Sequence, residues 1–198
     1  MAGPQQIVLI RHGEKPAEGK GGGSAPSGVN VHGEADADCL IPRGWQRAGA
    51  LAVLFDPASG PLREPLTRPD KLYAPAYGTD HKTRNHRTYE TILPLRHRLD
   101  LPIECELPTD RGAELAAKII GSDGGTSLVC WEHENIPLIA RAIPLAAGSP
   151  PIPSGWPNDA GGVPRFDVIW LFSRSPGAAG ASYSFAQLPQ LLLAGDSL

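Results

Sequence analysis

Hydrophobic residues occur along the chain in two patterns that alternate with each other. Short apolar runs are typical of buried strands, and we predict them at 6–10, 71–74, 103–107, 126–131 and 166–172, followed by an edge strand at 182–187. Helical spacing of apolar residues predicts helices over 43–55, 84–93 with a continuation past a kink at Pro94 to Leu99, 113–120 and 136–143. This alternation indicates an α/β fold, and we expect a three-layer α/β/α sandwich with a mainly parallel central sheet.

Glycine and proline are concentrated in two stretches, 16–30 and 148–164, which we predict to be loops. The chain of 198 residues has the length of one ordinary domain and no internal repeat. We therefore expect a single domain, 1–198, in which the loops 16–38 and 148–164 could form a small lid.

Composition excludes several classes of partner. With 41% hydrophobic and 20% charged residues the chain resembles soluble globular proteins, and its net charge of −3 predicts no surface for nucleic acid. No apolar run suggests a membrane span or a secretory signal, so we expect a cytoplasmic protein. The cysteines Cys39, Cys105 and Cys130 form no C-x-x-C pair, which argues against a zinc or disulfide framework. The basic stretch 81–87 instead suits a small anionic ligand.

Two predicted strands each end in a histidine. His12 follows the first strand and His133 follows the strand at 126–131. Ligands of α/β sheets bind at the carboxyl ends of the strands, so we expect both histidines at one site. Arg11 offers a fork of donors that matches phosphate oxygens, and Gly13 lets the backbone approach a ligand closely.

These residue types suit phosphoryl transfer. A neutral imidazole is a nucleophile near neutral pH because its ordinary pKa is about 6.5. Arginines and a second, protonated imidazole can offset the charge of the phosphate oxygens in the transition state. Because positioning and electrostatics carry most of this catalysis, neither a metal nor a cofactor is required. A carboxylic acid must still protonate the leaving oxygen and later activate water.

Four motifs occur in a fixed order between residues 7 and 139, over about two thirds of the chain. They are 11–14 (RHGE), 40–48 (LIPRGWQRA), 87–91 (RTYET, preceded by Tyr73-Ala74) and 128–133 (LVCWEH). In this order the motifs resemble those of the histidine phosphatase superfamily, which includes the phosphoglycerate mutases. The resemblance implies a phosphoglycerate mutase-like fold.

The resemblance also implies roles for individual residues. His12 would be the phosphorylated nucleophile, and His133 the second, charge-stabilising histidine. Arg11 and Arg87 would bind phosphate oxygens. Arg87 fits the family spacing better than Arg84, although both could face one ligand because residues three apart share a helix face.

The proton donor stays open between two residues. One branch of the family places an acid directly after the second histidine, which here is Glu134, and another places a glutamate after a middle strand, which best fits Glu106. Glu14, Glu104 and Glu132 are weaker candidates. We favour Glu134 slightly, although its expected position at a helix N-terminus favours the ionised form.

The activity implied by the resemblance is metal-independent hydrolysis of a small phosphorylated substrate through a phosphohistidine on His12. One alternative is a phosphomutase with the same chemistry, less favoured because the chain is short for an extensive cap. The other is a phosphate-binding module without turnover. The oligomeric state stays open, with the apolar segments 166–172 and 188–193 available for a subunit contact.

Other polar and aromatic residues are expected to have no part in catalysis. A metal site in the first loop could draw on His32, Glu34, Asp36 and Asp38. This loop is Gly-rich and has no further ligand pattern, so we predict a solvated loop without a metal. We expect three histidines at the surface, of which the first two could touch a substrate: His81, His86 and His97. Trp156, in the second loop, could line the rim of the pocket.

Overall fold

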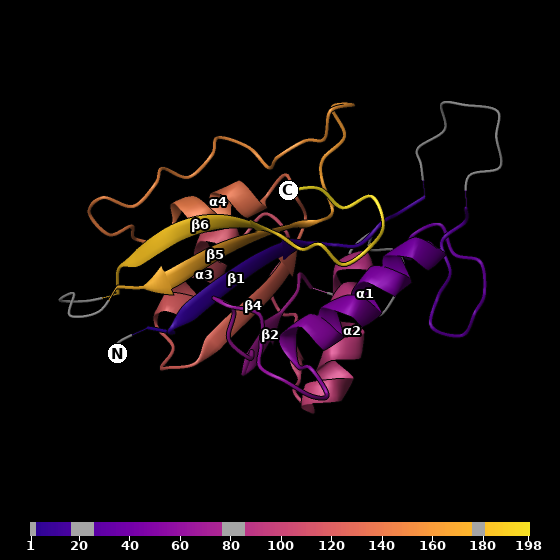
Figure 1. The fold of residues 1–198 in the computed structure, drawn as a ribbon, viewed down its shortest axis with the longest axis horizontal. Helices are drawn as coiled ribbons and strands as arrows, with labels where there is room; N and C mark the ends of the chain where they lie inside the picture. The colour runs from indigo at the N-terminus through magenta and orange to yellow at the C-terminus, as the bar shows by residue number, and fades with distance from the viewer. Residues whose placement is uncertain (1–2, 17–25, 77–85, 176–180) are drawn as a thin grey trace.

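A computed structural model describes residues 3–16, 26–76, 86–175 and 181–198, which contain six strands and four helices (Figure 1). The strands are β1 (Gln6–Arg11), β2 (Lys71–Tyr73), β3 (Ile103–Glu104), β4 (Thr126–Trp131), β5 (Val168–Arg174) and β6 (Tyr183–Pro189). The helices are α1 (Pro42–Phe55), α2 (His86–Leu99), α3 (Gly112–Ile120) and α4 (Ile136–Arg141).

The strands form one sheet in the order β3-β2-β4-β1-β5-β6. The first four strands of this order run parallel to one another. Strand β5 is antiparallel to β1, and β6 is antiparallel to β5. The sheet is therefore mainly parallel with β6 at its edge, as the sequence predicts, whereas the antiparallel orientation of β5 was not predicted. Arg11 at the end of β1 is in register with Trp131 at the end of β4. The segments that carry the two strand-end histidines consequently leave the sheet side by side.

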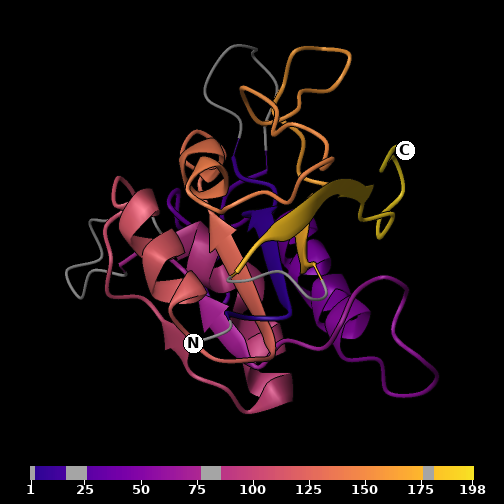
Figure 2. The same ribbon diagram turned by 90° about the vertical axis from the view of Figure 1, so that its left-hand side faces the viewer.

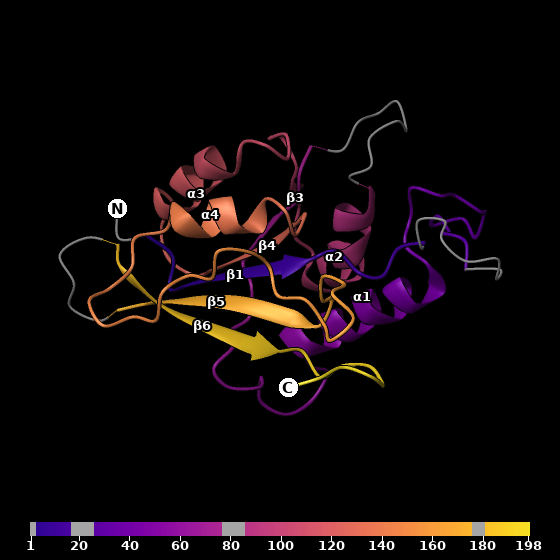
Figure 3. The same ribbon diagram turned by 90° about the horizontal axis from the view of Figure 1, so that it is seen from above.

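Helices cover both faces of the sheet. In Figures 2 and 3, α3 and α4 lie together on one side, away from α1 and α2. The side chains of β1 alternate between the two layers: Ile7 and Leu9 join a core with α3 and α4, whereas Val8 and Ile10 join a core with α1 and α2. This alternation explains why residues 7–10 of β1 are all apolar. The predicted three-layer sandwich is confirmed.

Several elements end elsewhere than predicted. Strand β3 has two residues because beyond Glu104 the chain makes only isolated contacts, such as Ala76 N to Leu107 O at 2.8 Å. Helix α4 stops at Arg141, two residues short of the predicted end, because Pro144 disfavours helical backbone before it. Pro94 lies inside α2, which continues to Leu99. Among the described residues no helix is long and apolar enough to cross a membrane.

Close packing of two glycines holds the segment after β1 against α1. A Cβ added at Gly44 would overlap the carbonyl oxygen of Glu14 and lie 3.0 Å from its amide nitrogen, and a Cβ added at Gly13 would lie 3.0 Å from Gly44 O. We expect Gly44→Ala to lower the free energy of unfolding by about 1–3 kcal/mol, because backbone must move to make room. Urea denaturation measures this loss.

Gly49→Ala, in the same helix, is the matched control. An added Cβ there meets no described atom within 4 Å, so alanine should stabilise the helix by up to about 1 kcal/mol. Equal effects of the two substitutions would contradict the packing argument.

Candidate active site

His12 lies directly after β1 and is 6% exposed. Its Nδ1 is 2.7 Å from the carbonyl oxygen of Gly13. Because a carbonyl only accepts, Nδ1 must carry a proton, which leaves Nε2 with a lone pair. Burial, reinforced by the charges of Arg11 and Arg87, lowers the pKa of His12 well below its usual value. The ring is therefore neutral, with Nε2 available as a nucleophile.

Arg11 is held in a cation–π contact over Phe166, with Cζ 3.9 Å from the ring centroid. Its Nη1 donates to the carbonyl oxygen of Pro164. Its buried Nε has no hydrogen-bond partner among the described residues. Burial lowers the pKa of Arg11 to about 10, so the group stays cationic at neutral pH. An unpaired buried donor is costly, and an anion at this position would satisfy it.

His133 and Glu134 follow β4 and lie within electrostatic reach of Arg11. Burial, followed by the charge of Arg11, lowers the pKa of the half-buried His133, and Glu134 opposes this shift. Without an anion the neutral form of the second imidazole is therefore favoured, whereas the sequence argument requires the protonated form once phosphate is bound. A bound phosphate dianion would raise its pKa, because opposite charge favours the protonated ring.

Arg87, in the first turn of α2, interacts electrostatically with His12 and Arg11. It lowers the pKa of both His12 and Arg11. Its Nη2 donates to Ala37 O at 2.8 Å and lies 3.8 Å from the carboxylate of Asp38. The loop before α1 thus orients Arg87. Arg84, the alternative, lies outside the described residues.

Thr91 connects α2 to the histidine loop. Its hydroxyl accepts a hydrogen bond from Gly13 N at 2.8 Å and donates one to Arg87 O at 2.6 Å. The side chain therefore ties the backbone next to His12 to the backbone of Arg87. The spacing of four residues between Arg87 and Thr91 therefore has a structural reason, because Thr91 holds the backbone of Arg87 close to the segment that carries His12.

The structure does not bring Glu106 to this group. Its side chain is 79% exposed and forms an ion pair with Lys118 of α3 at 3.2 Å. Lys118 also binds Glu104 at 2.7 Å. Both glutamates are therefore engaged by α3. Glu14 is buried, but it is bound by Arg47 at 2.8 Å.

Sequence reasoning missed two residues near the site, Phe166 and Lys15, and ranked a third, Glu132, only as a weaker candidate for the proton donor. Phe166 contacts Arg11 and also His12, whose ring centroid is 5.8 Å away; it precedes β5 and does not belong to it as predicted. Glu132 has a pKa raised by burial and by Glu134. Lys15 acts on His12 and Glu132 through its charge. Only the closeness of Lys15 to His12 in the sequence could have indicated it.

Two predictions about individual side chains are wrong. Trp156 is buried in the core and not at a rim, because it packs on Trp170 with ring centroids 5.1 Å apart and donates from Nε1 to Arg165 O at 2.7 Å. His86 is not at the surface but 2% exposed, because the loop before α1 covers it with Cys39. His97 is exposed as predicted, and His81 lies outside the described residues.

Comparisons with known proteins identify the fold. No family model and no curated protein matches the chain. The structure is similar to the protein histidine phosphatase SixA complexed with tungstate, with a TM-score of 0.50, 14% identity, and 93% of this chain and 97% of that chain covered. It is also similar to a mycobacterial glucosyl-3-phosphoglycerate phosphatase complexed with VO3, with a TM-score of 0.51, 13% identity, and 92% of this chain and 97% of that chain covered. The complex of the same phosphatase with inorganic phosphate gives a TM-score of 0.50 and 14% identity, with 93% of this chain and 95% of that chain covered. The chain therefore has the phosphoglycerate mutase-like α/β fold of the histidine phosphatase superfamily.

Proposed function

We propose that the protein is a metal-independent phosphatase that hydrolyses phosphomonoesters through a phosphohistidine on His12. The observation that carries the proposal is the state of His12, a buried neutral imidazole whose Nδ1 is engaged by Gly13 O and whose Nε2 keeps its lone pair. The unpaired Nε of Arg11 beside it supports an oxyanion ligand. Proteins with this fold bind tungstate, VO3 and phosphate.

The chemistry follows in two steps. Nε2 of His12 attacks phosphorus, the bond to the leaving oxygen breaks, and Glu134 gives its proton to that oxygen. Arg11 and Arg87 hold the remaining oxygens. In the second step Glu134 accepts a proton from water, the water oxygen bonds to phosphorus, and the P–N bond breaks. Phosphate leaves and His12 is neutral again.

Glu134 is the proposed donor because its charge acts on both Arg11 and His133. We expect Glu134→Gln to lower kcat for an alkyl phosphate by about 10²-fold or more, since the alkoxide needs a proton as it leaves. An aryl phosphate with a good leaving group should be affected less. Steady-state rates with both substrates measure this difference.

Glu132→Gln is the matched control, because Glu132 lies two residues away and its charge interacts with that of Glu134. It should leave the ratio of alkyl to aryl rates unchanged. If Glu132→Gln alone produces the alkyl-specific loss, the donor is Glu132 and our assignment is wrong.

The test of the function is a rapid-quench experiment with a ³²P-labelled aryl phosphate. A phosphatase of this kind should release phosphate over many turnovers and yield a phosphoenzyme that resists base and is cleaved by acid. The rate should not depend on added Mg²⁺. Tight phosphate binding without release would instead establish a binding module, and transfer to an alcohol acceptor in place of water would establish a mutase.

The protonation state of His12 provides a separate prediction. Because burial and Arg11 lower its pKa, the ring should stay neutral as the pH falls through 6.5 and take up a proton only at lower pH. NMR titration of the imidazole nitrogens, with His12 assigned from the spectrum of His12→Ala, measures this. A ring that is half protonated near pH 6.5 would contradict the structure.

A further inference from the structure

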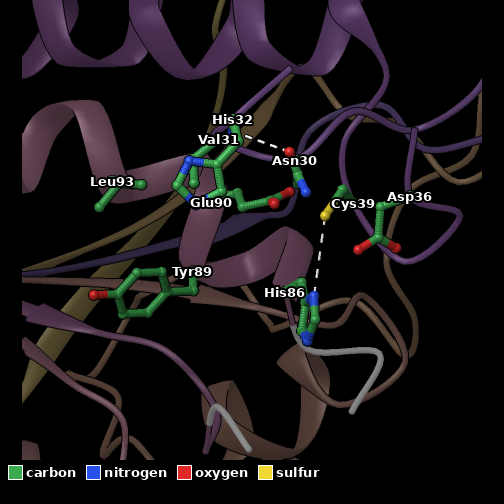
Figure 4. Close-up of a pocket in the computed structure, with 9 residues that line it drawn as sticks. All are labelled: Asn30, Val31, His32, Asp36, Cys39, His86, Tyr89, Glu90 and Leu93. Atoms are coloured by element: carbon green, nitrogen blue, oxygen red, sulfur yellow. Dashed lines mark hydrogen bonds between the residues drawn. The ribbon is translucent and has the colours of Figure 1, made fainter. Parts of the chain in front are cut away.

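A second group of ligand atoms lies where the loop between β1 and α1 meets the start of α2. Asp36 and Cys39 come from the loop, and His86 is the first residue of α2. One ligand atom from each side chain lies within 4.8 Å of the other two. Figure 4 shows Sγ of Cys39 between the carboxylate of Asp36 and the ring of His86. Segments 47 residues apart in the sequence therefore converge here.

The sulfur of Cys39 and the nitrogen of His86 are close to the spacing of two ligands on a tetrahedral metal ion. Zinc binds sulfur at about 2.3 Å and nitrogen at about 2.0 Å, so tetrahedral geometry places the two ligands about 3.5 Å apart. Sγ of Cys39 is 4.0 Å from Nδ1 of His86, and a movement of about half an ångström closes the difference. Thiolate and imidazole select ions of the zinc class, because Mg²⁺ and Ca²⁺ prefer oxygen ligands.

The surroundings leave room for a fourth ligand. Cys39 and His86 are 1% and 2% exposed, whereas Asp36 is half-buried. All three line a cavity of about 220 Å³ whose wall includes Tyr89 and Glu90 (Figure 4). Three protein ligands with an open position facing a cavity allow water to complete the coordination shell.

Glu90 provides a second layer around the ligands. It stands one helical turn after His86, so the two side chains share a face of α2. Its carboxylate accepts a hydrogen bond from Leu40 N at 2.8 Å and another from the thiol of Cys39. An ion that binds here must therefore release a proton.

We propose that Asp36, Cys39 and His86 bind a divalent transition-metal ion of the zinc class, with water in the fourth position. A carboxylate and a thiolate balance the charge of such an ion. The ion fastens the loop to the first turn of α2, next to the contact between Arg87 and Ala37. The site takes no part in phosphoryl transfer and does not rest on the proposed phosphatase activity.

This proposal reverses the prediction of a solvated loop without a metal. Glu34 does stay within the loop, where Asn30 donates to its carboxylate at 3.0 Å. The carboxylate of Asp36 accepts a hydrogen bond from Asp38 N at 2.9 Å and also lies close to Cys39 and His86. The sequence could not show this, because its acidic residues are adjacent in the loop whereas the histidine belongs to a distant helix.

The test uses the full chain, reduced and stripped of metal by a chelator. Titration with Co²⁺ should release a proton and produce one equivalent of tetrahedral d–d absorption together with a sulfur-to-cobalt charge-transfer band. Zn²⁺ should then displace Co²⁺ without further proton release. Cys39→Ser should remove the charge-transfer band. His86→Gln should weaken binding by more than about 100-fold, the upper effect of losing only an outer partner.

Matched controls are Cys105→Ser, at a half-buried cysteine, and His97→Gln, at an exposed histidine. Both should bind Co²⁺ as the unmodified chain does. If Cys39→Ser does not fold, Asp36→Asn still tests the site: this half-buried loop residue should lower affinity, and with it the rise in melting temperature caused by Zn²⁺. Absence of stoichiometric binding, or a charge-transfer band that disappears in Cys105→Ser, would overturn the proposal.

Discussion

Replacing His12 with alanine is expected to lower the rate of phosphate release by at least about 10⁴-fold, within the range seen when an enzyme loses its covalent nucleophile. Nε2 is the buried, unprotonated nitrogen that lies beside Arg11, and without it water would have to attack the anionic phosphorus directly. The phosphoenzyme should disappear completely. Steady-state phosphate release and acid–base stability of the quenched, labelled protein measure the two effects.

Binding should survive this substitution. Arg11 and Arg87 remain in place, and the Thr91 contact to Gly13 uses backbone rather than the imidazole. His12→Ala should therefore still bind inorganic phosphate, by calorimetry, within about an order of magnitude of the unmodified chain. His97→Ala, at an exposed position in the last turn of α2, should retain full turnover. Turnover of His12→Ala within tenfold of normal would exclude His12 as the nucleophile.

The layered fold could be predicted because buried strands appear in the sequence as short runs of apolar residues. All six residues of β1 and of β4 are buried, and the central residues of both strands are apolar on both faces of the sheet. Hydrophobicity alone could not set the ends of the elements. Phe166 is equally apolar whether it belongs to a strand or covers Arg11, so its position before β5 could be known only from the structure.

The site could be predicted only where sequence position dictates spatial position. Parallel strands in register bring the ends of β1 and β4 together, so the segments that carry His12 and His133 leave the sheet side by side. Glu106 also follows a strand, but its exposure and its ion pair with Lys118 depend on how α3 packs. The convergence of Cys39 and His86 likewise depends on tertiary packing, because no local sequence pattern predicts which loop covers which helix.

Replacing Arg47 with alanine is expected to lower the free energy of unfolding by about 3–5 kcal/mol, because it leaves buried charge without a partner. The guanidinium, from α1, is 2% exposed and binds Glu14 at 2.8 Å, Asp196 at 2.7 Å and Gln190 at 2.9 Å. It therefore joins the segment after β1 to the C-terminal segment. Urea denaturation with a constant m-value measures the loss.

Arg43→Ala is the control for this network. Arg43 lies on the same helix and binds the same carboxylate of Glu14 at 3.2 Å, but its side chain is 43% exposed. Water screens such a pair, so its loss should cost no more than about 1 kcal/mol. Equal losses for Arg43→Ala and Arg47→Ala would show that burial of the Arg47 network does not control stability.

The pH dependence of unfolding separates the network from simple packing. Burial alone would raise the pKa of Asp196, but hydrogen bonds from Arg47 and from the amides of Leu192 and Leu193 lower it to about 2. The resulting stabilisation is fully present above the unfolded pKa of about 3.9 and is lost as the pH falls through about 2. Between pH 4 and 2 the unmodified chain should therefore lose more stability than Arg47→Ala.

Because Glu14 is two residues from His12, Arg47→Ala should also lower kcat, whereas Arg43→Ala should leave kcat unchanged.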